Sequence, residues 1–168
     1  MDIVSEPLTL EILNKSNPSS PAEGYGDRGR LYRGTTEIIW EQDNKVSACP
    51  NATNPHTGQP WDSCYAMIAY GTYDGEVIND KVAGHGICIV LNNHGAVPAR
   101  LVNLSPLTDH FGKLIATGVL VHKGQEVSGK WCRGSAACIT ISPDVYDSLF
   151  SLLPVGTKLQ VVVRHNGD

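Results

Sequence analysis

The best-defined unit of this chain is Cys132-Arg-Gly-Ser-Ala-Ala-Cys-Ile-Thr-Ile-Ser-Pro-Asp-Val-Tyr-Asp-Ser-Leu-Phe150, followed closely by Leu159-Gln-Val-Val-Val163. Residues 139–141 alternate apolar and polar side chains and include β-branched residues, which predicts a short, half-buried strand. Ser142 and Pro143 then favour a helix start. Serine accepts hydrogen bonds from the free N–H groups of a first turn, and proline loses nothing there by lacking a donor.

The helix that follows has one apolar face and a clear end. Asp144 adds negative charge at the positive end of the helix dipole. The residues that fall on one helical face are Val145, Leu149 and either Leu152 or Leu153. Pro154 and Gly156 stop the helix, and residues 159–163 return as a strand. The segment therefore predicts strand, small helix, strand.

Length and composition limit the classes of protein to consider. The chain has 168 residues, of which 41% are apolar, so we expect one domain with a real core. The formal net charge is −4 and no Lys/Arg cluster exists, which argues against nucleic acid as a partner. No apolar run approaches the about 20 residues that a membrane span needs. The start, Met1-Asp-Ile-Val-Ser-Glu6, is not typical of a signal peptide, so we expect either an intracellular protein or a mature form with an added methionine.

Cysteines and sequons favour secretion. Asn14-Lys-Ser, Asn51-Ala-Thr and Asn103-Leu-Ser are glycosylation sequons. With 17 glycines and 10 prolines, they indicate a secreted, disulfide-containing, loop-rich β protein. The disulfide candidates are Cys49, Cys64, Cys88, Cys132 and Cys138. Their odd number leaves at least one thiol free in a monomer, and the connectivity stays open although the spacing of Cys132 and Cys138 permits a small loop.

Strand patterns outnumber helical ones along the rest of the chain. Strands are expected at residues 8–13, 29–33, 35–40, 86–91 and 99–104. The segment 86–91 should enter a tight turn at Asn92-Asn-His-Gly95 and pair with 99–104. Residues 65–70 fit a strand or a helical turn, and 43–63 is expected to be a long loop. The prediction is a mostly-β chain with one or two short helices, in which residues 1–28 form an N-terminal strand and arm before a domain at 29–168.

Four segments in this order resemble a known family. They are Val46-Ser-Ala-Cys-Pro50, Asp62-Ser-Cys-Tyr-Ala-Met-Ile-Ala-Tyr-Gly-Thr-Tyr-Asp-Gly75, Gly86-Ile-Cys-Ile-Val-Leu-Asn-Asn-His-Gly95 and 132–150. Together they resemble the double-psi β-barrel family of rare lipoprotein A, barwin, expansin barrel domains and cerato-platanins. The resemblance implies a six-stranded double-psi β-barrel in residues 29–168, with long loops and one or two short helices.

The family's catalytic aspartate is missing. In catalytic members an aspartate beside the cysteine matched by Cys132, or at the end of the preceding strand, acts as general acid/base on a glycosidic bond. Here Lys130 and Trp131 precede Cys132, and Asn103 takes the strand-end position. Neither lysine nor asparagine donates and recovers a proton as a buried carboxylic acid does. The resemblance therefore implies binding without hydrolysis.

Two carboxylates remain as catalytic candidates if the chain does cleave glycans. Asp109 stands beside His110, and a carboxylate next to an imidazole is suited to acid/base work on a glycan. Neighbours on a strand point to opposite faces, however. An aspartate in a turn beside an exposed histidine accounts for the same two residues. Asp62 is the other candidate.

Thiol and metal chemistry are weaker readings. Cys64 faintly resembles a cysteine-hydrolase nucleophile with His85 or His94 downstream, but a disulfide or burial explains it better. These two histidines with His110 or His122 follow no metal-ligand spacing. No metal or cofactor is expected.

Aromatic residues are the predicted ligand contacts. Rings can stack on the apolar faces of sugars, and Trp61 and Trp131 lie in polar, loop-like surroundings. We expect them to be exposed beside a groove between the 43–63 loop and Trp131. Tyr65 and Tyr73 join them as candidates, as does Lys130, while Trp40, Tyr32 and Tyr70 are further rings. The alternative is that most of these rings fill the barrel or cover its ends.

The sequence thus predicts a secreted, monomeric, non-catalytic binding protein whose partner is a cell-wall polysaccharide. A secreted inhibitor or effector that binds another protein is the second reading. A glycan-cleaving enzyme with a displaced aspartate, Asp62 or Asp109, is the third. Barrel folds carry many kinds of site, so the fold alone does not choose between them.

Overall fold

The computed structural model describes residues 6–15, 25–48, 66–81, 84–101, 115–127, 130–132 and 138–165. Near the gaps, some strand residues are described by their backbone pairing alone. The elements in chain order are β1 Leu8–Asn14, β2 Asp27–Arg33, β3 Glu37–Ser47, β4 Ala66–Ile68, β5 Gly71–Asp80, β6 Gly86–Leu91, η1 Asn92–His94, β7 Val97–Leu101, β8 Ile115–Ala116, β9 Leu120–Lys123, β10 Gln125–Val127, β11 Lys130–Cys132, β12 Ile139–Ile141, α1 Pro143–Phe150 and β13 Lys158–His165.

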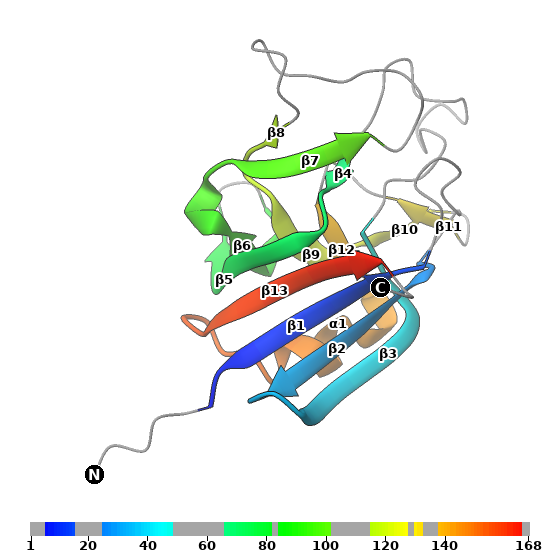
Figure 1. Ribbon diagram of the computed structural model, residues 1–168. Coiled ribbons are helices and arrows are strands. Elements are labelled where there is room, and N and C mark those ends of the chain that lie inside the picture. The colour runs from blue at the N-terminus through cyan, green and yellow to red at the C-terminus, as the bar shows by residue number, and fades with distance from the viewer. Residues whose placement is uncertain are drawn as a thin grey trace.

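The core of the fold is a closed barrel (Figure 1). Its strands follow one another in the order β1-β13-β5-β6-β9-β12-β3-β2, and β2 closes onto β1. Two neighbouring pairs are parallel, β1 with β13 and β9 with β12. The prediction of a mostly-β chain that forms a barrel is therefore confirmed.

The predicted number of six strands is wrong, because eight strands form the wall. The segment expected as a separate N-terminal strand is β1, which pairs with β13 on one side and with β2 on the other. A strand with an apolar inner face is stabilised when both its edges find partners, since unpaired backbone groups are costly. The described barrel therefore includes residues from the predicted arm.

One apolar cluster fills the barrel interior, and alternate residues of the strands contribute their side chains to it. Leu10 and Ile12 of β1 face inward beside Val161 and Val163 of β13, their register partners. Close packing requires a glycine at Gly29, where an added Cβ would lie 2.9 Å from the Trp40 ring and from Val46. The alternation of apolar residues, the strand register and the side-chain sizes are thus all consistent with one closely packed interior.

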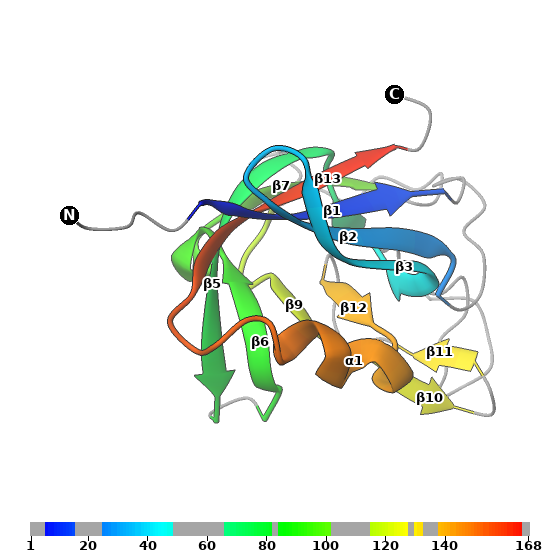
Figure 2. The same ribbon diagram turned by 90° about the horizontal axis from the view of Figure 1, so that it is seen from below.

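The predicted strand–helix–strand unit is confirmed as β12, α1 and β13. Pro143 occupies the first turn of α1, and Val145 and Leu149 are buried on its inner face. Leu153 continues that face at 1% exposure, whereas Leu152 is 41% exposed. The helix lies across the lower end of the barrel (Figure 2), where Trp40 Nε1 donates to Ser148 Oγ over 3.0 Å. The Ser142 hydroxyl, expected to cap the helix backbone, instead donates to the Asp144 carboxylate.

The predicted pairing of 86–91 with 99–104 is wrong. Strand β6 forms where expected, but it pairs with β5 and β9. After it, η1 carries Asn92, Asn93 and His94 at φ values of 48°, 51° and 65°. This left-handed run redirects the chain into β7, which pairs with β4 and β8 in a separate three-stranded sheet. A two-residue hairpin turn would have returned the chain along β6.

Candidate functional site

A buried polar cluster lies at the end of the barrel where β1 and β13 finish. Asp27, the first residue of β2, is only 1% exposed. Its carboxylate accepts hydrogen bonds from Asn14 Nδ2 (3.1 and 3.2 Å), from the Lys15 backbone N–H (2.8 Å) and from the Ala48 backbone N–H (2.8 Å). The Tyr70 hydroxyl donates to Asn14 Oδ1 over 2.7 Å. Asp27 therefore fastens the ends of β1 and β3 to the start of β2, and its acceptor capacity is used for that purpose.

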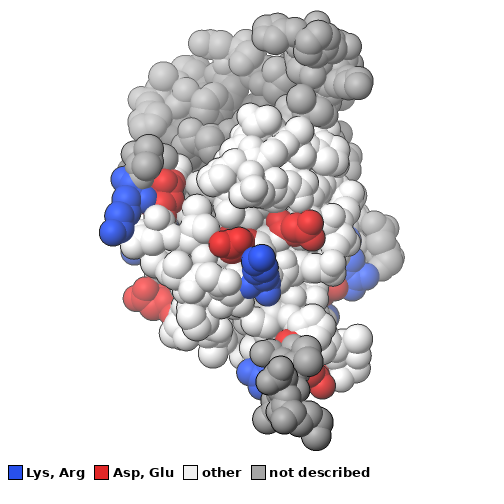
Figure 3. Space-filling model, turned by 90° about the vertical axis from the view of Figure 1, so that its left-hand side faces the viewer, with Lys and Arg blue, Asp and Glu red and all other residues white. Residues whose placement is uncertain are grey.

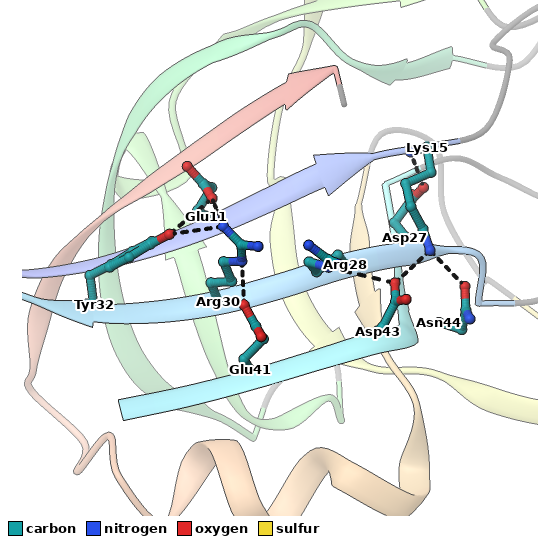
Figure 4. Close-up of polar contacts among 9 residues, drawn as sticks. All are labelled: Glu11, Lys15, Asp27, Arg28, Arg30, Tyr32, Glu41, Asp43 and Asn44. Atoms are coloured by element: carbon teal, nitrogen blue, oxygen red, sulfur yellow. Dashed lines mark hydrogen bonds and ion pairs between the residues drawn. The ribbon is translucent and has the colours of Figure 1, made fainter. Parts of the chain in front are cut away.

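The outer face of β13, β1, β2 and β3 carries a ladder of alternating charges (Figure 4). Glu11 lies 3.0 Å from Arg164 Nε and 3.9 Å from Arg30, and Arg30 reaches on to Glu41. Opposite charges on neighbouring strands stabilise such a surface modestly. The ladder neutralises itself and so presents no strong field of one sign.

A second group of charges continues this face toward the polar cluster. Lys15 Nζ contacts Asp43 Oδ1 (2.5 Å) and Asn44 Oδ1 (2.9 Å), and Arg28 lies 3.7 Å from Asp43. The hydrogen bond from Lys15 is the main cause that lowers the pKa of Asp43. This carboxyl group stays ionised and is unsuited to act as a general acid near neutral pH.

Three further charged residues, Asp74, Glu76 and Lys158, line a surface pocket of about 390 Å³. Its polar rim consists of the Asp74 and Glu76 carboxylates, the Asn93 amide and the Lys158 ammonium group. Gly75, Val90 and Leu159 complete its lining. In Figure 3 the side of the barrel on which β13 begins faces the viewer, and acidic side chains lie on either side of a basic one on a largely uncharged surface.

Strand alternation places the two carboxylates on the same outer face. Asp74 and Glu76 are exposed, while Tyr73, Gly75 and Val77 between and beside them are buried. Lys158 of β13 is the register partner of Glu76, and Val90 of β6 is its partner on the other side. Side chains directly opposite across antiparallel strands come within contact distance. The pocket rim is therefore set by sheet register.

The left-handed turn η1 supplies the remaining wall. Asn92 Oδ1 accepts from the Asp74 backbone N–H over 3.2 Å, which ties η1 to β5 just beyond the end of the β5–β6 ladder. Asn93 follows at φ 51° and lines the pocket. Asparagine tolerates this conformation better than most residues. The turn that diverts the chain thus also positions a polar side chain over the pocket.

Cys88 and Cys138 form a small buried cluster with Val90 and Leu120 on the outer side of β6 and β9. Cys88 carries a free thiol. Burial, reinforced by the nearby Asp80 and Cys138, raises the pKa of Cys88 to about 11. A thiol in that state is a poor nucleophile because the thiolate is the reactive form.

Two histidines lie close to this cluster. His85 Nδ1 is 2.7 Å from Asp80 Oδ2, and the His85 and His122 ring centroids are 4.8 Å apart. Among the described residues, no group of three or more His, Cys, Asp and Glu side chains is arranged to hold a metal ion. Within the same ranges no helix is long and apolar enough to cross a membrane.

Most of the predicted site residues lie outside the described part of the chain, so their roles are untested. Trp61, Tyr65, Asp62 and Asp109 lie outside the described residues, as do Cys49, Cys64 and Asn103. Lys130 and Trp131 lie in β11, where they pair with Val127 and Glu126, and Cys132 pairs with Gln125. Their roles in binding or in disulfides stay predictions.

Tyr73 is the exception, since its side chain is described. It is 4% exposed and belongs to the barrel core. Its hydroxyl donates to the Ala69 carbonyl. A ring packed in this way offers no open face to a sugar. In this structure Tyr73 therefore packs within the barrel wall beside the pocket and does not form a stacking platform.

The pocket residues left only a partial signal in the sequence. The alternation Tyr73-Asp-Gly-Glu-Val77 indicates a strand with two carboxylates on its polar face. Asn93 and Lys158 are distant in sequence, and only the pairing of β5 with β6 and β13 brings them near. Comparison with family models, with curated proteins and with solved structures found no match to this chain.

Proposed function

We propose that this chain is a secreted barrel protein that binds a glycan without cleaving it. The observation that carries the proposal is the pocket between β5, β6, η1 and β13. Its volume of about 390 Å³ falls at the lower end of the range for small-molecule sites. A pocket of this size suits a short segment of a polysaccharide rather than a large folded partner.

The lining matches the chemistry of a sugar. A sugar ring carries hydroxyl groups that donate and accept hydrogen bonds, and it has an apolar face of C–H groups. The Asp74 and Glu76 carboxylates accept, the Lys158 ammonium donates, and the Asn93 amide does both. Val90 and Leu159 are the apolar residues of the lining. Polar groups that converge around an apolar base give both orientation and affinity.

The absence of cleavage is the second part of the proposal. The family aspartate is replaced by Lys130-Trp131 in the sequence. Asp43 and Asp144 have lowered pKa values, caused first by hydrogen bonds from Lys15 and Lys45. A general acid at neutral pH needs a raised pKa instead. Asp27 is buried and committed to backbone N–H groups.

Membership of the double-psi barrel family belongs to the same proposal. It is supported by the order of the four resembling segments and by the barrel that they contribute to. The last segment, residues 132–150, runs through β12 into α1, and β13 follows it. The expansin- and barwin-like members are the relatives that this proposal implies, together with a cell-wall polysaccharide as the ligand and secretion as the location.

Binding to a protein is the second candidate, and a different surface favours it. Ile38, Leu152 and Val155 are large apolar side chains with exposures of 48%, 41% and 57%. Leu152 also lines a depression of about 360 Å³, together with Leu8, Ile39, Glu6 and Arg33. Exposed apolar groups bordered by charges are typical of protein contact sites when they are contiguous.

A pull-down on insoluble cellulose, chitin and peptidoglycan, with soluble products assayed from the same tubes, tests the proposal. We expect binding without released sugars. The variant Asn93→Ala/Lys158→Met should lose binding, whereas Lys81→Met, an exposed lysine outside the pocket, should retain it. Circular dichroism confirms that each variant is folded.

Other outcomes would overturn parts of the proposal. Loss of binding in Trp131→Ala but not in the pocket variant would move the site to the groove predicted from the sequence. Released sugars that disappear in Asp109→Asn or Asp62→Asn would establish the enzyme instead. No binding to any polysaccharide would refute glycan binding and leave the apolar surface as the candidate.

A further inference from the structure

Resting on the proposed function, we infer that the glycan held in the pocket carries free amino groups. The charged groups of the rim are two carboxylates and one ammonium, so the rim has an excess negative charge. The sheet register decides where that excess lies. Lys158 is directly opposite Glu76, and the partner of Asp74 is the uncharged Gln160. Within this register, Asp74 therefore has no cation directly opposite it.

Among the described residues, the other elements that line the pocket bring no lysine or arginine to Asp74. Strand β6 contributes Val90, and η1 contributes Asn93 with the exposed His94 after it. Within the described part of the chain, Asp74, Glu76 and Lys158 take part in no ion pair with another described residue. The carboxylates on the outer face of β1 to β3, in contrast, lie in ion pairs.

The two surfaces differ in whether their carboxylates already have a charged partner within the protein. Glu11, Glu41 and Asp43 each contact an arginine or lysine, which satisfies them within the protein (Figure 4). Asp74 lines a pocket, where contact with a ligand excludes water and strengthens electrostatic interactions. An ammonium group of the ligand is the partner that such a carboxylate selects.

The ranking of glycans follows from hydrogen-bond chemistry. A protonated amine on a sugar ring donates a hydrogen bond to the Asp74 carboxylate and also adds the attraction between two opposite charges. An acetylated amine or a hydroxyl at the same place donates without a charge. A uronic acid brings a third carboxylate beside Asp74 and Glu76 and is repelled. The expected order is amino sugar, then neutral sugar, then acidic sugar.

Calorimetric titration of the whole chain with oligomers of equal length tests this order. The probes are oligomers of glucosamine, of N-acetylglucosamine and of galacturonic acid. We expect the glucosamine oligomer to bind about tenfold more tightly than the acetylated one, with a preference that weakens as salt is added. Asp74→Asn should reduce the preference to about twofold or less while acetylated oligomers still bind. Asp147→Asn removes the same charge from an exposed site on α1 and should leave the preference intact.

The outcomes separate this inference from the proposed function. Equal binding of both hexosamine oligomers, reduced equally by Asn93→Ala, would refute the amino-sugar inference and keep glycan binding. A preference that Asp147→Asn reduces as much as Asp74→Asn would assign it to net charge and refute it too. Binding of no oligomer would refute the proposed function itself.

Discussion

Asn14 donates its side-chain amide to both carboxylate oxygens of Asp27, across 3.1 and 3.2 Å, at a place where the two residues are 0% and 1% exposed. The carboxylate also receives the backbone N–H groups of Lys15 and Ala48. A buried charge is tolerated when several donors satisfy it. One side chain therefore fixes three strand ends.

Asp27→Ala should strongly destabilise the barrel. The change leaves buried donors of Asn14, Lys15 and Ala48 without their acceptor, and each such loss costs about 1–3 kcal/mol. We expect the free energy of unfolding to fall by about 3 kcal/mol or more, as measured by urea denaturation. Asp147→Ala, at an exposed position, should change it by less than about 0.5 kcal/mol. Similar values for the two variants would contradict the role assigned to Asp27.

Acid should weaken two surface ion pairs in a defined pH range. Hydrogen bonds from Lys45 and then Ser142 hold the pKa of Asp144 below its ordinary value of 3.8, and Lys15 does the same for Asp43. Because these pKa values are lower in the folded state, the pairs contribute stability above pH 3.8. That contribution is lost as the pH falls from 3.8 through the folded-state pKa.

The effect should be small, since both pairs are exposed. NMR titration of the Asp144 carboxyl group should give a midpoint below 3.8 in the native chain and a higher one in Lys45→Met. The matched variant Lys15→Met should shift Asp43 and leave Asp144 unchanged. An Asp144 midpoint that does not respond to Lys45→Met would show that the ion pair does not form in solution.

Local signals were enough to predict the unit β12–α1–β13. Ser142, Pro143 and the apolar spacing of Val145 and Leu149 all act within one turn or two of the chain. The strand count depends on distant pairing instead. Nothing near Leu8 indicates that β1 inserts between β2 and β13, because its parallel partner lies at the other end of the sequence.

The pairing error at 86–104 has a local physical cause. Asn92-Asn-His-Gly95 has the composition of a hairpin turn, but three consecutive left-handed residues send the chain to β7. The same turn places Asn93 at the pocket, so the candidate site was missed for the same reason. The sequence favoured tryptophans in loops, whereas the polar side chains of the pocket lie on two strands and in η1.

Gly29→Ala should destabilise the barrel, because the closely packed interior has no room for even one added methyl group there. An alanine Cβ there would approach Trp40 Cζ3 and Val46 Cγ2 to 2.9 Å. Overpacking of this kind costs about 1–3 kcal/mol. Gly71→Ala is the matched control, since its Cβ would meet Tyr73 at an ordinary 3.4 Å. Urea denaturation should separate the two variants, and equal stability would contradict the close approach of β2 and β3.

Cys88 and Cys138 should be unreactive in the folded protein. Both are buried, at 0% and 3% exposure, and the pKa of Cys88 is raised to about 11 chiefly by burial. At pH 8 the thiolate needed for attack on a disulfide reagent is therefore scarce at Cys88, and the reagent has little access to either residue. Titration with a chromogenic disulfide should give the same native thiol count for the original chain and for Cys88→Ala/Cys138→Ala. In denaturant the variant should show two fewer thiols. A rapid native reaction that the double variant abolishes would mean that this cluster opens readily, and a denatured count that does not change would mean that the two cysteines are oxidised.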